Sequence, residues 1–345
     1  MARKQSVKYL MKSALSNKLA LGRSKYEDQK QTRIERHKLM QKGVPYQERL
    51  KINKSQDYIY CTNTFNIYNR HVEKFATYLE QEHGIKKVND IEEAIPYIQQ
   101  YINYLDKEKD WSPYTIYLAT SAIAKATNTY VFDYEKPRRT SANITRGRQE
   151  AINDEKNERL AKKSMEINRL LGLRRSQLSR LKVCDIRERY IGKQRICEVH
   201  TIGKGKKHNI QIFYKKDEIE KVLALKNGKA DNEYILTKEE MNHDADLHSM
   251  RRERACYLYN AILEEIENDS DKRKFYQDEI RRIFREAGKT VTENMDKKVY
   301  LRGATRQKAI NEGLEIEYDR TALLAVSCMV LNHYRSNVTL AYYIR

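Results

Sequence analysis

The sequence lacks most of the signals that would indicate a metalloprotein, a redox enzyme or a membrane protein. Its five cysteines are scattered and form no CxxC pair, so neither a zinc site nor a thiol redox centre is expected. The longest apolar run, residues 322–331, is too short to cross a bilayer, and the N-terminal residues contain no apolar signal-peptide core. No internal repeat or low-complexity tract is present. We therefore expect a cytoplasmic protein with no membrane partner.

Acidic residues are scarce relative to basic ones. The chain of 345 residues has 67 Lys and Arg against 48 Asp and Glu, which gives a formal net charge of +19. Such an excess indicates a polyanionic partner, and double-stranded DNA is the first candidate. A basic surface that serves only solubility is the alternative. The length allows two domains with separate cores.

The positive charge is concentrated near the N-terminus. Residues 1–54 carry 15 Lys and Arg against 4 Asp and Glu, which is typical of a DNA-binding arm that orders along a phosphate backbone. Between 55 and 135, apolar residues at steps of three and four predict three helices, with a kink or late start at Pro96 and an N-cap at Ser112-Pro113. The positions that define these helices are Phe65, Tyr68, Val72, Phe75 and Leu79; Ile91, Ala94, Ile98, Ile102 and Leu105; and Ile116, Ala119, Ile123 and Ala126.

A basic linker is predicted at residues 136–150. Such a linker could cross a duplex while two domains hold its opposite faces, or it could serve solubility alone. Its candidate DNA-binding residues are Lys136, Arg138, Arg139, Arg146 and Arg148.

Residues 151–345 predict a second domain of helices and a short hairpin. The expected fold class is therefore mainly α with a small antiparallel sheet, an α+β arrangement. In chain order the elements are a helix at 161–171, a second helix opening at 172–178, β-like runs at 196–202 and 209–214 joined by a lysine-rich turn, and a helix at 247–257 followed by a long helical region.

Four features of this second domain stand in a recognisable order. They are Gly172-Leu173-Arg174, Lys204 in a Gly-Lys-Gly turn, His248-x-x-Arg251, and Leu331-Asn332-His333 followed by Tyr342 and Tyr343. Together they resemble the motifs of the tyrosine recombinase (phage integrase) family of site-specific DNA recombinases. The resemblance implies a helical core-binding domain at 55–135 and a catalytic domain at 151–345.

The chemistry implied by the resemblance needs these residue types. Arg174 and Arg251 would neutralise the two non-bridging oxygens of a phosphodiester under attack, and His248 would leave the same helix face as Arg251. Lys204 would protonate the leaving 5′ oxygen, and His333 would add a hydrogen bond or assist the phenol. No metal ion or other cofactor is expected, because the arginines supply the positive charge.

Three departures from the family pattern are present. Gln177 stands where an acidic residue is usual, and Asn332 replaces the usual glycine. Asparagine tolerates a left-handed backbone better than most residues. The interval between Arg251 and His333 is far longer than in compact family members, which predicts an inserted helical subregion at about 265–318 for protomer or DNA contacts.

The resemblance implies that the nucleophile is Tyr342 or Tyr343. Adjacent helical residues point about 100° apart, so only one of them can face the phosphate. Val338 and Tyr342 share an apolar edge, which predicts that Tyr342 packs and favours Tyr343 slightly.

The sequence thus predicts a recombinase or integrase that joins DNA through a 3′-phosphotyrosyl intermediate, for integration and excision of a mobile element. The resemblance implies a tetramer on paired DNA sites, with accessory DNA-bending or directionality proteins as further partners. Because only two residues follow Tyr343, we expect protomers to communicate through the insertion or the arm. The alternatives are a type IB topoisomerase or hairpin resolvase, a non-catalytic DNA-binding protein of the same fold, and an unrelated nucleic-acid-binding protein.

Overall fold

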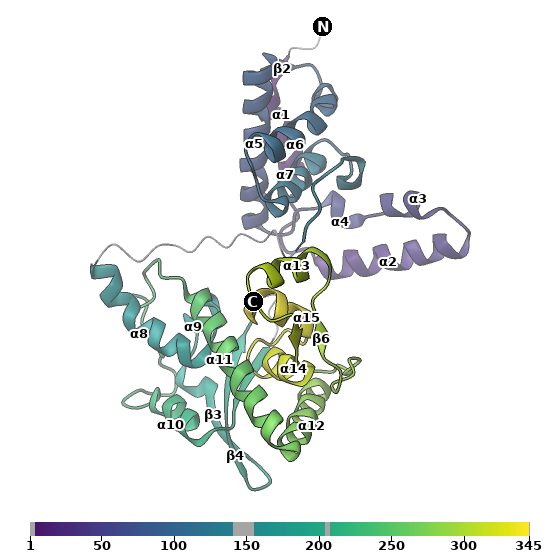
Figure 1. The fold of residues 1–345 in the computed structure, drawn as a ribbon. Helices are drawn as coiled ribbons and strands as arrows, with labels where there is room; N and C mark the ends of the chain where they lie inside the picture. The colour runs from purple at the N-terminus through teal and green to yellow at the C-terminus, as the bar shows by residue number, and fades with distance from the viewer. Residues whose placement is uncertain (1–3, 141–154, 204–207, 345) are drawn as a thin grey trace. The chain divides into compact units, whose positions relative to one another are not determined.

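The computed structural model describes residues 4–140, 155–203 and 208–344, which belong to two compact units divided between Arg146 and Gly147 (Figure 1). Each unit has its own hydrophobic core. Unit 1 contains β1 (Gln5–Ser6), α1 (Val7–Asn17), α2 (Lys25–Gln41), α3 (Tyr46–Lys51), α4 (Lys54–Asp57), α5 (Thr62–His83), β2 (Lys87–Val88), α6 (Ile98–Lys107) and α7 (Pro113–Ala126). Unit 2 contains α8 (Glu155–Leu171), α9 (Arg175–Leu178), β3 (Ile186–Ile191), β4 (Gln194–Ile202), β5 (His208–Phe213), α10 (Lys216–Ala224), α11 (Leu247–Asn268), α12 (Ser270–Glu286), β6 (Val299–Tyr300), α13 (Gly303–Asn311), β7 (Glu317–Tyr318), α14 (Arg320–Met329), α15 (Ser336–Thr339) and a terminal π-helix (Leu340–Ile344).

Unit 1 is a helical bundle in which the three predicted apolar stripes face one another. Val72, Phe75 and Leu79 of α5 are fully buried against α7. The predicted interruption at Pro96 is confirmed, because a 3₁₀ turn over Ile91–Tyr97 precedes α6. The predicted cap is confirmed as well, since the Ser112 hydroxyl accepts a hydrogen bond from the backbone N–H of Thr115 at 3.3 Å.

The basic segment 1–54 differs from the predicted arm in its first part. In α1, Val7, Met11 and Leu15 are buried in the core of unit 1, and β1 pairs with β2. The high average charge concealed this short stripe with its spacing of four residues. The following α2 buries only Asp28 and Thr32, and most of its other side chains, Lys30 and Arg33 among them, are exposed.

Unit 2 confirms a mainly helical fold class with a small antiparallel sheet. The predicted hairpin corresponds to β4 and β5, which pair from Cys197 with Phe213 to Ile202 with His208. The sheet has a third strand, β3, which pairs with the other edge of β4 and was missed by the sequence analysis. Charged and exposed residues dominate β3, as is common for an edge strand, so it lacks a clear apolar alternation.

The segment predicted as an insertion contributes to the core of unit 2. Its main helix, α12, buries Ile280, Ile283 and Phe284 and packs against α14. The rest comprises a loop at 287–298, the small β6–β7 sheet and α13. The end of the chain lies close to α11, because the terminal π-helix contacts that helix (Figure 1). No described helix is long and apolar enough to be a candidate membrane span.

Candidate active site

Tyr343 lies in a cluster with three other predicted site residues. The residue is only 5% exposed, and its ring centroid lies 5.6 Å from that of His248 and 5.8 Å from that of His333. The guanidinium carbon of Arg251 lies 5.5 Å from the Tyr343 ring centroid. His248 and Arg251 are three residues apart on α11, so they share one face of that helix. Four groups from three separate parts of the sequence therefore meet around one phenol.

Tyr342, the other candidate nucleophile, is 40% exposed. This exposure differs from the prediction that Tyr342 packs along an apolar edge shared with Val338. The reason is the π-helix over Leu340–Ile344, which changes the angular spacing on which the argument from Val338 depended. The arrangement favours Tyr343, whose catalytic role stays a prediction.

Arg251 is 1% exposed and joins two distant turns of unit 2. Its guanidinium donates one hydrogen bond to the Gly172 carbonyl and another, at 2.9 Å, to the Leu331 carbonyl. Its Nε–H has no hydrogen-bond partner among the described residues. Burial lowers the pKa of Arg251, and the charge of Arg174 lowers it further, whereas the Tyr343 phenol opposes the change. The guanidinium stays charged at neutral pH and keeps a donor for a ligand.

The turn that carries Arg174 is built around a glycine. Gly172 has a φ of +63°, and a Cβ at this position would lie 3.0 Å from Cγ of Arg254, so only glycine fits without a shift. Buried Asn168 closes the turn by accepting a hydrogen bond from Leu173 N–H at 2.7 Å and donating another to the Leu247 carbonyl at 2.7 Å. The half-buried Arg174 follows, close enough to lower the pKa of both Arg251 and His333.

His333 is neutral in this environment. Burial lowers its pKa to about 3, with contributions from the positive charges of Arg251, Arg174, Arg335 and Lys289. Neither ring nitrogen has a hydrogen-bond partner among the described residues. A buried polar group normally has a partner, so two orphaned nitrogens beside cationic groups indicate a place for an anionic ligand.

The two substituted motif residues, Asn332 and Gln177, each have a structural role. Asn332 has a φ of +53°, in the left-handed region that asparagine tolerates better than most residues. Its side-chain oxygen accepts a hydrogen bond from Ile210 N–H at 3.2 Å. Gln177 accepts a hydrogen bond from Arg174 N–H at 3.2 Å and donates to the Thr201 hydroxyl at 2.8 Å. The neutral amide therefore links the arginine turn to β4 without a charge.

The other predicted residues lie in unit 1 or outside the described residues. Lys204, Arg146 and Arg148 lie outside the described residues. Lys136 donates hydrogen bonds to the carbonyls of Val131 and Tyr134. The Arg139 guanidinium lies 4.1 Å from the ring centroid of Tyr117, and the side chain of Arg138 is exposed. Lys136 thus bonds to the backbone of the preceding turn of unit 1. The DNA contacts predicted for this linker stay a prediction.

The sequence analysis missed residues that support the site, among them Asn168, described above, and Gln211. Gln211 on β5 is 1% exposed and donates to the Leu171 carbonyl at 2.8 Å and to the Val330 carbonyl at 2.9 Å. It therefore connects the two turns that Arg251 also joins. Its position as a polar residue within an apolar strand was the only available signal. Among the described residues, no group of three or more His, Cys, Asp and Glu is arranged to hold a metal ion.

Neither a known family profile nor a curated protein matches the sequence. Solved structures do match. Two of them are crystal structures of the XerH site-specific recombinase bound to difH substrate, one a post-cleavage and one a pre-cleavage complex. Their sequences are 15% and 14% identical to this chain. Each match covers 97% of this chain, and 90% and 91% of the XerH chains, with a TM-score of 0.37. The XerA recombinase structure is 18% identical, with a TM-score of 0.20, over 82% of this chain and 87% of its own.

These three structures are of recombinases. They are of the kind that the sequence motifs indicated. Identities and TM-scores of this size do not carry the functional argument, which depends on the side chains described above.

Proposed function

We propose that this protein is a site-specific DNA recombinase that cleaves and rejoins DNA through a 3′-phosphotyrosyl intermediate. The observation that carries the proposal is the meeting of Tyr343, His248, Arg251 and His333 in a cluster with unused hydrogen-bonding atoms. A phosphate would supply acceptors for the orphaned Arg251 N–H and for a His333 N–H.

The reaction begins with attack by the Tyr343 oxygen on the scissile phosphorus. The phenol gives its proton to solvent, the new bond links the tyrosine to the 3′ phosphate, and the bond to the 5′ oxygen breaks. Arg251 and Arg174 stabilise the charge that accumulates on the non-bridging oxygens. Neutral His333 accepts or donates a hydrogen bond without adding a further positive charge. Lys204 is the proposed donor of the proton that the 5′ oxygen takes up.

Reversal of these steps completes recombination. A 5′-hydroxyl from a second strand attacks the phosphotyrosyl bond, the tyrosine regains its proton, and the number of phosphodiester bonds is unchanged. No nucleotide hydrolysis is needed. Integration and excision of a mobile element, on paired sites held by a tetramer with accessory proteins, are the proposed setting.

Covalent trapping tests the proposal. The probe is a pool of duplex oligonucleotides with randomised flanks and a nick at one fixed position, so that cleavage near the nick releases a short fragment and prevents rejoining. Wild-type protein should form complexes that survive denaturing electrophoresis, and Tyr343→Phe should form none. Tyr342→Phe is the matched control and should retain trapping.

Two outcomes would contradict this assignment. Loss of trapping in Tyr342→Phe alone would transfer the nucleophile to that residue, and trapping by neither variant nor wild type would remove the catalytic proposal. Sequencing of trapped DNA supplies the target site for a strand-exchange assay. Products that join two different duplexes support a recombinase, whereas plasmid relaxation without exchange supports a topoisomerase.

A further inference from the structure

The His333 segment has an unusual backbone on both sides of the histidine. Asn332 has a φ of +53° and Tyr334 a φ of +60°, so two residues with side chains adopt the left-handed conformation within three positions. An aromatic residue rarely adopts this conformation, and it persists only where surrounding contacts impose it. His333 and Tyr334 both donate their backbone N–H groups to the Ser327 carbonyl, at 3.1 and 3.4 Å. The segment is thus a tight turn that ends α14.

The contacts on the two sides of His333 come from different parts of unit 2. Asn332 is held by β5, through its hydrogen bond to Ile210. Tyr334 is held by the inserted segment. Its ring lies edge-on to that of Phe284 on α12, with centroids 5.2 Å apart and an interplanar angle of 84°. The Lys289 ammonium lies 3.2 Å from the centroid of the same Tyr334 ring.

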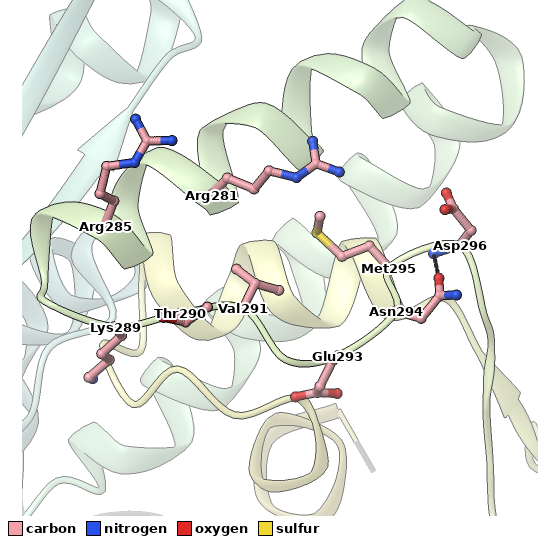
Figure 2. Close-up of a pocket in the computed structure, with 9 residues that line it drawn as sticks. All are labelled: Arg281, Arg285, Lys289, Thr290, Val291, Glu293, Asn294, Met295 and Asp296. Atoms are coloured by element: carbon pink, nitrogen blue, oxygen red, sulfur yellow. Dashed lines mark hydrogen bonds between the residues drawn. The ribbon is translucent and has the colours of Figure 1, made fainter.

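The same inserted loop also reaches the helix that leads to Tyr343. Glu293 accepts a hydrogen bond from the hydroxyl of Ser336, which is 3% exposed and is the first residue of α15. The Glu293 carboxylate also lies 3.8 Å from Nε of Arg320 on α14. Figure 2 shows Lys289 and Glu293 on the loop after α12, with the Glu293 side chain pointing away from that helix.

A cavity of about 500 Å³ lies between this loop and α12, and it is separate from the Tyr343 cluster. Arg281 and Arg285 line it from α12, as Figure 2 shows, and none of the predicted site residues does. Lys289 and Glu293 line this cavity too, and with Tyr334 they also line a second cavity of about 380 Å³. The specific contacts of the loop with the C-terminal segment are those of Lys289 with the Tyr334 ring and of Glu293 with Ser336. Through these two contacts the loop reaches both the turn that carries His333 and the helix that leads to Tyr343.

We propose that the inserted segment is a positioning element of the active site, in which Lys289 and Glu293 hold the turn that presents His333 and Tyr343. The proposal rests on the proposed function and assigns a task to the segment that lengthens the interval between Arg251 and His333. Lys289 and Glu293 are positioning residues, because each acts through Tyr334 or Ser336.

The first experiment needs no DNA. Diethyl pyrocarbonate modifies accessible neutral imidazoles, and peptide mass spectrometry gives the rate at His333 in the full chain. Lys289→Gln and Glu293→Ala should each increase this rate several-fold, and Lys289→Arg should restore the wild-type rate. Lys297→Gln is the matched control, since it removes an exposed cation from the same loop. Unchanged His333 modification in both test variants overturns the proposal.

The second experiment measures covalent trapping and DNA binding separately. Lys289→Gln and Glu293→Ala should reduce the single-turnover trapping rate about tenfold, with DNA affinity within about twofold of that of Lys297→Gln. An equal loss of affinity and rate, without rescue by Lys289→Arg, overturns positioning in favour of a direct DNA contact. Absence of trapping by the wild type overturns the proposed function, and the modification rates then decide alone whether the loop holds His333.

Discussion

Substitution of Asn332 tests how the His333 turn is held. Alanine would lose the hydrogen bond to Ile210 N–H, worth about 1 kcal/mol, and would meet the left-handed backbone with a penalty of about 1 kcal/mol that asparagine partly avoids. The expected loss for Asn332→Ala is therefore about 2 kcal/mol. Glycine would also lose the hydrogen bond, but it adopts the left-handed backbone freely. Asn332→Gly should therefore lower the free energy of unfolding by about 1 kcal/mol, a value that includes the greater entropy of glycine in the unfolded chain.

Thermal unfolding can resolve this order because the two units have different spectroscopic reporters. Trp111, the one tryptophan of the chain, belongs to unit 1, whereas far-UV circular dichroism reports both units. The unit 2 transition is the one seen by circular dichroism and not by Trp111 fluorescence. For a unit of this size, 1 kcal/mol shifts the midpoint by about 2–4 °C, so Asn332→Ala should lower the midpoint of the unit 2 transition by about 4–8 °C. The fluorescence transition of Trp111 should not move. Equal stability of the alanine variant and wild type, or a glycine variant less stable than the alanine variant, would refute the reasoning.

Three further predictions concern buried and exposed charges. Glu218 and Arg254 form a buried ion pair with contacts of 2.6 and 2.9 Å. Glu218→Gln should therefore destabilise unit 2 by about 3–5 kcal/mol, whereas the double variant Glu218→Met with Arg254→Met should lose much less free energy of unfolding. Denaturant unfolding of both variants measures the difference. Because the pKa of His333 is about 3, NMR titration of the free protein should show no protonation of this ring near pH 6, and His333→Gln serves to assign its signals. Bound DNA should raise the pKa of His333. Titration of His333 near pH 6.5 without DNA would contradict the described electrostatics of the site. Because the unfolded histidine takes up its proton at higher pH, this group should make unit 2 less stable as the pH falls from about 6.5 toward 3, relative to His333→Gln. Replacing exposed Lys30 and Arg33 of α2 by Gln should reduce the salt slope of DNA binding by up to about 2 without changing the melting temperature, and an unchanged slope would exclude α2 from the interface.

Local patterns predicted those parts of the molecule in which one apolar stripe determines one element. The α5 stripe through Val72 and Leu79, the Ser112 cap and the β4–β5 hairpin all have short-range signals, and all are present. The His-x-x-Arg spacing likewise predicted that His248 and Arg251 would share a helix face. These features need no knowledge of the rest of the chain.

Other features depend on contacts between distant residues and left no local signal. The burial of α1 is decided by its packing on α5, and Gln211 is recognisable as a support only when the turns at Leu171 and Val330 are seen beside it. The sequence argument favoured Tyr343 but misplaced Tyr342, because it assumed α-helical geometry where the chain forms a π-helix. The contacts of Lys289 and Glu293 with the His333 turn also required the fold.

The hydrogen bond between Arg251 and the Leu331 carbonyl has a consequence for protein synthesis. Chains emerge from the ribosome N-terminus first, so Arg174, His248 and Arg251 are made well before Leu331, His333 and Tyr343. Until the late segment arrives, Arg251 lacks one of its two carbonyl partners and the site has no tyrosine. A nascent or prematurely terminated chain can therefore have the basic surface, yet it lacks the proposed nucleophile. Under the proposed function, DNA cleavage would be confined to chains whose synthesis has passed Tyr343.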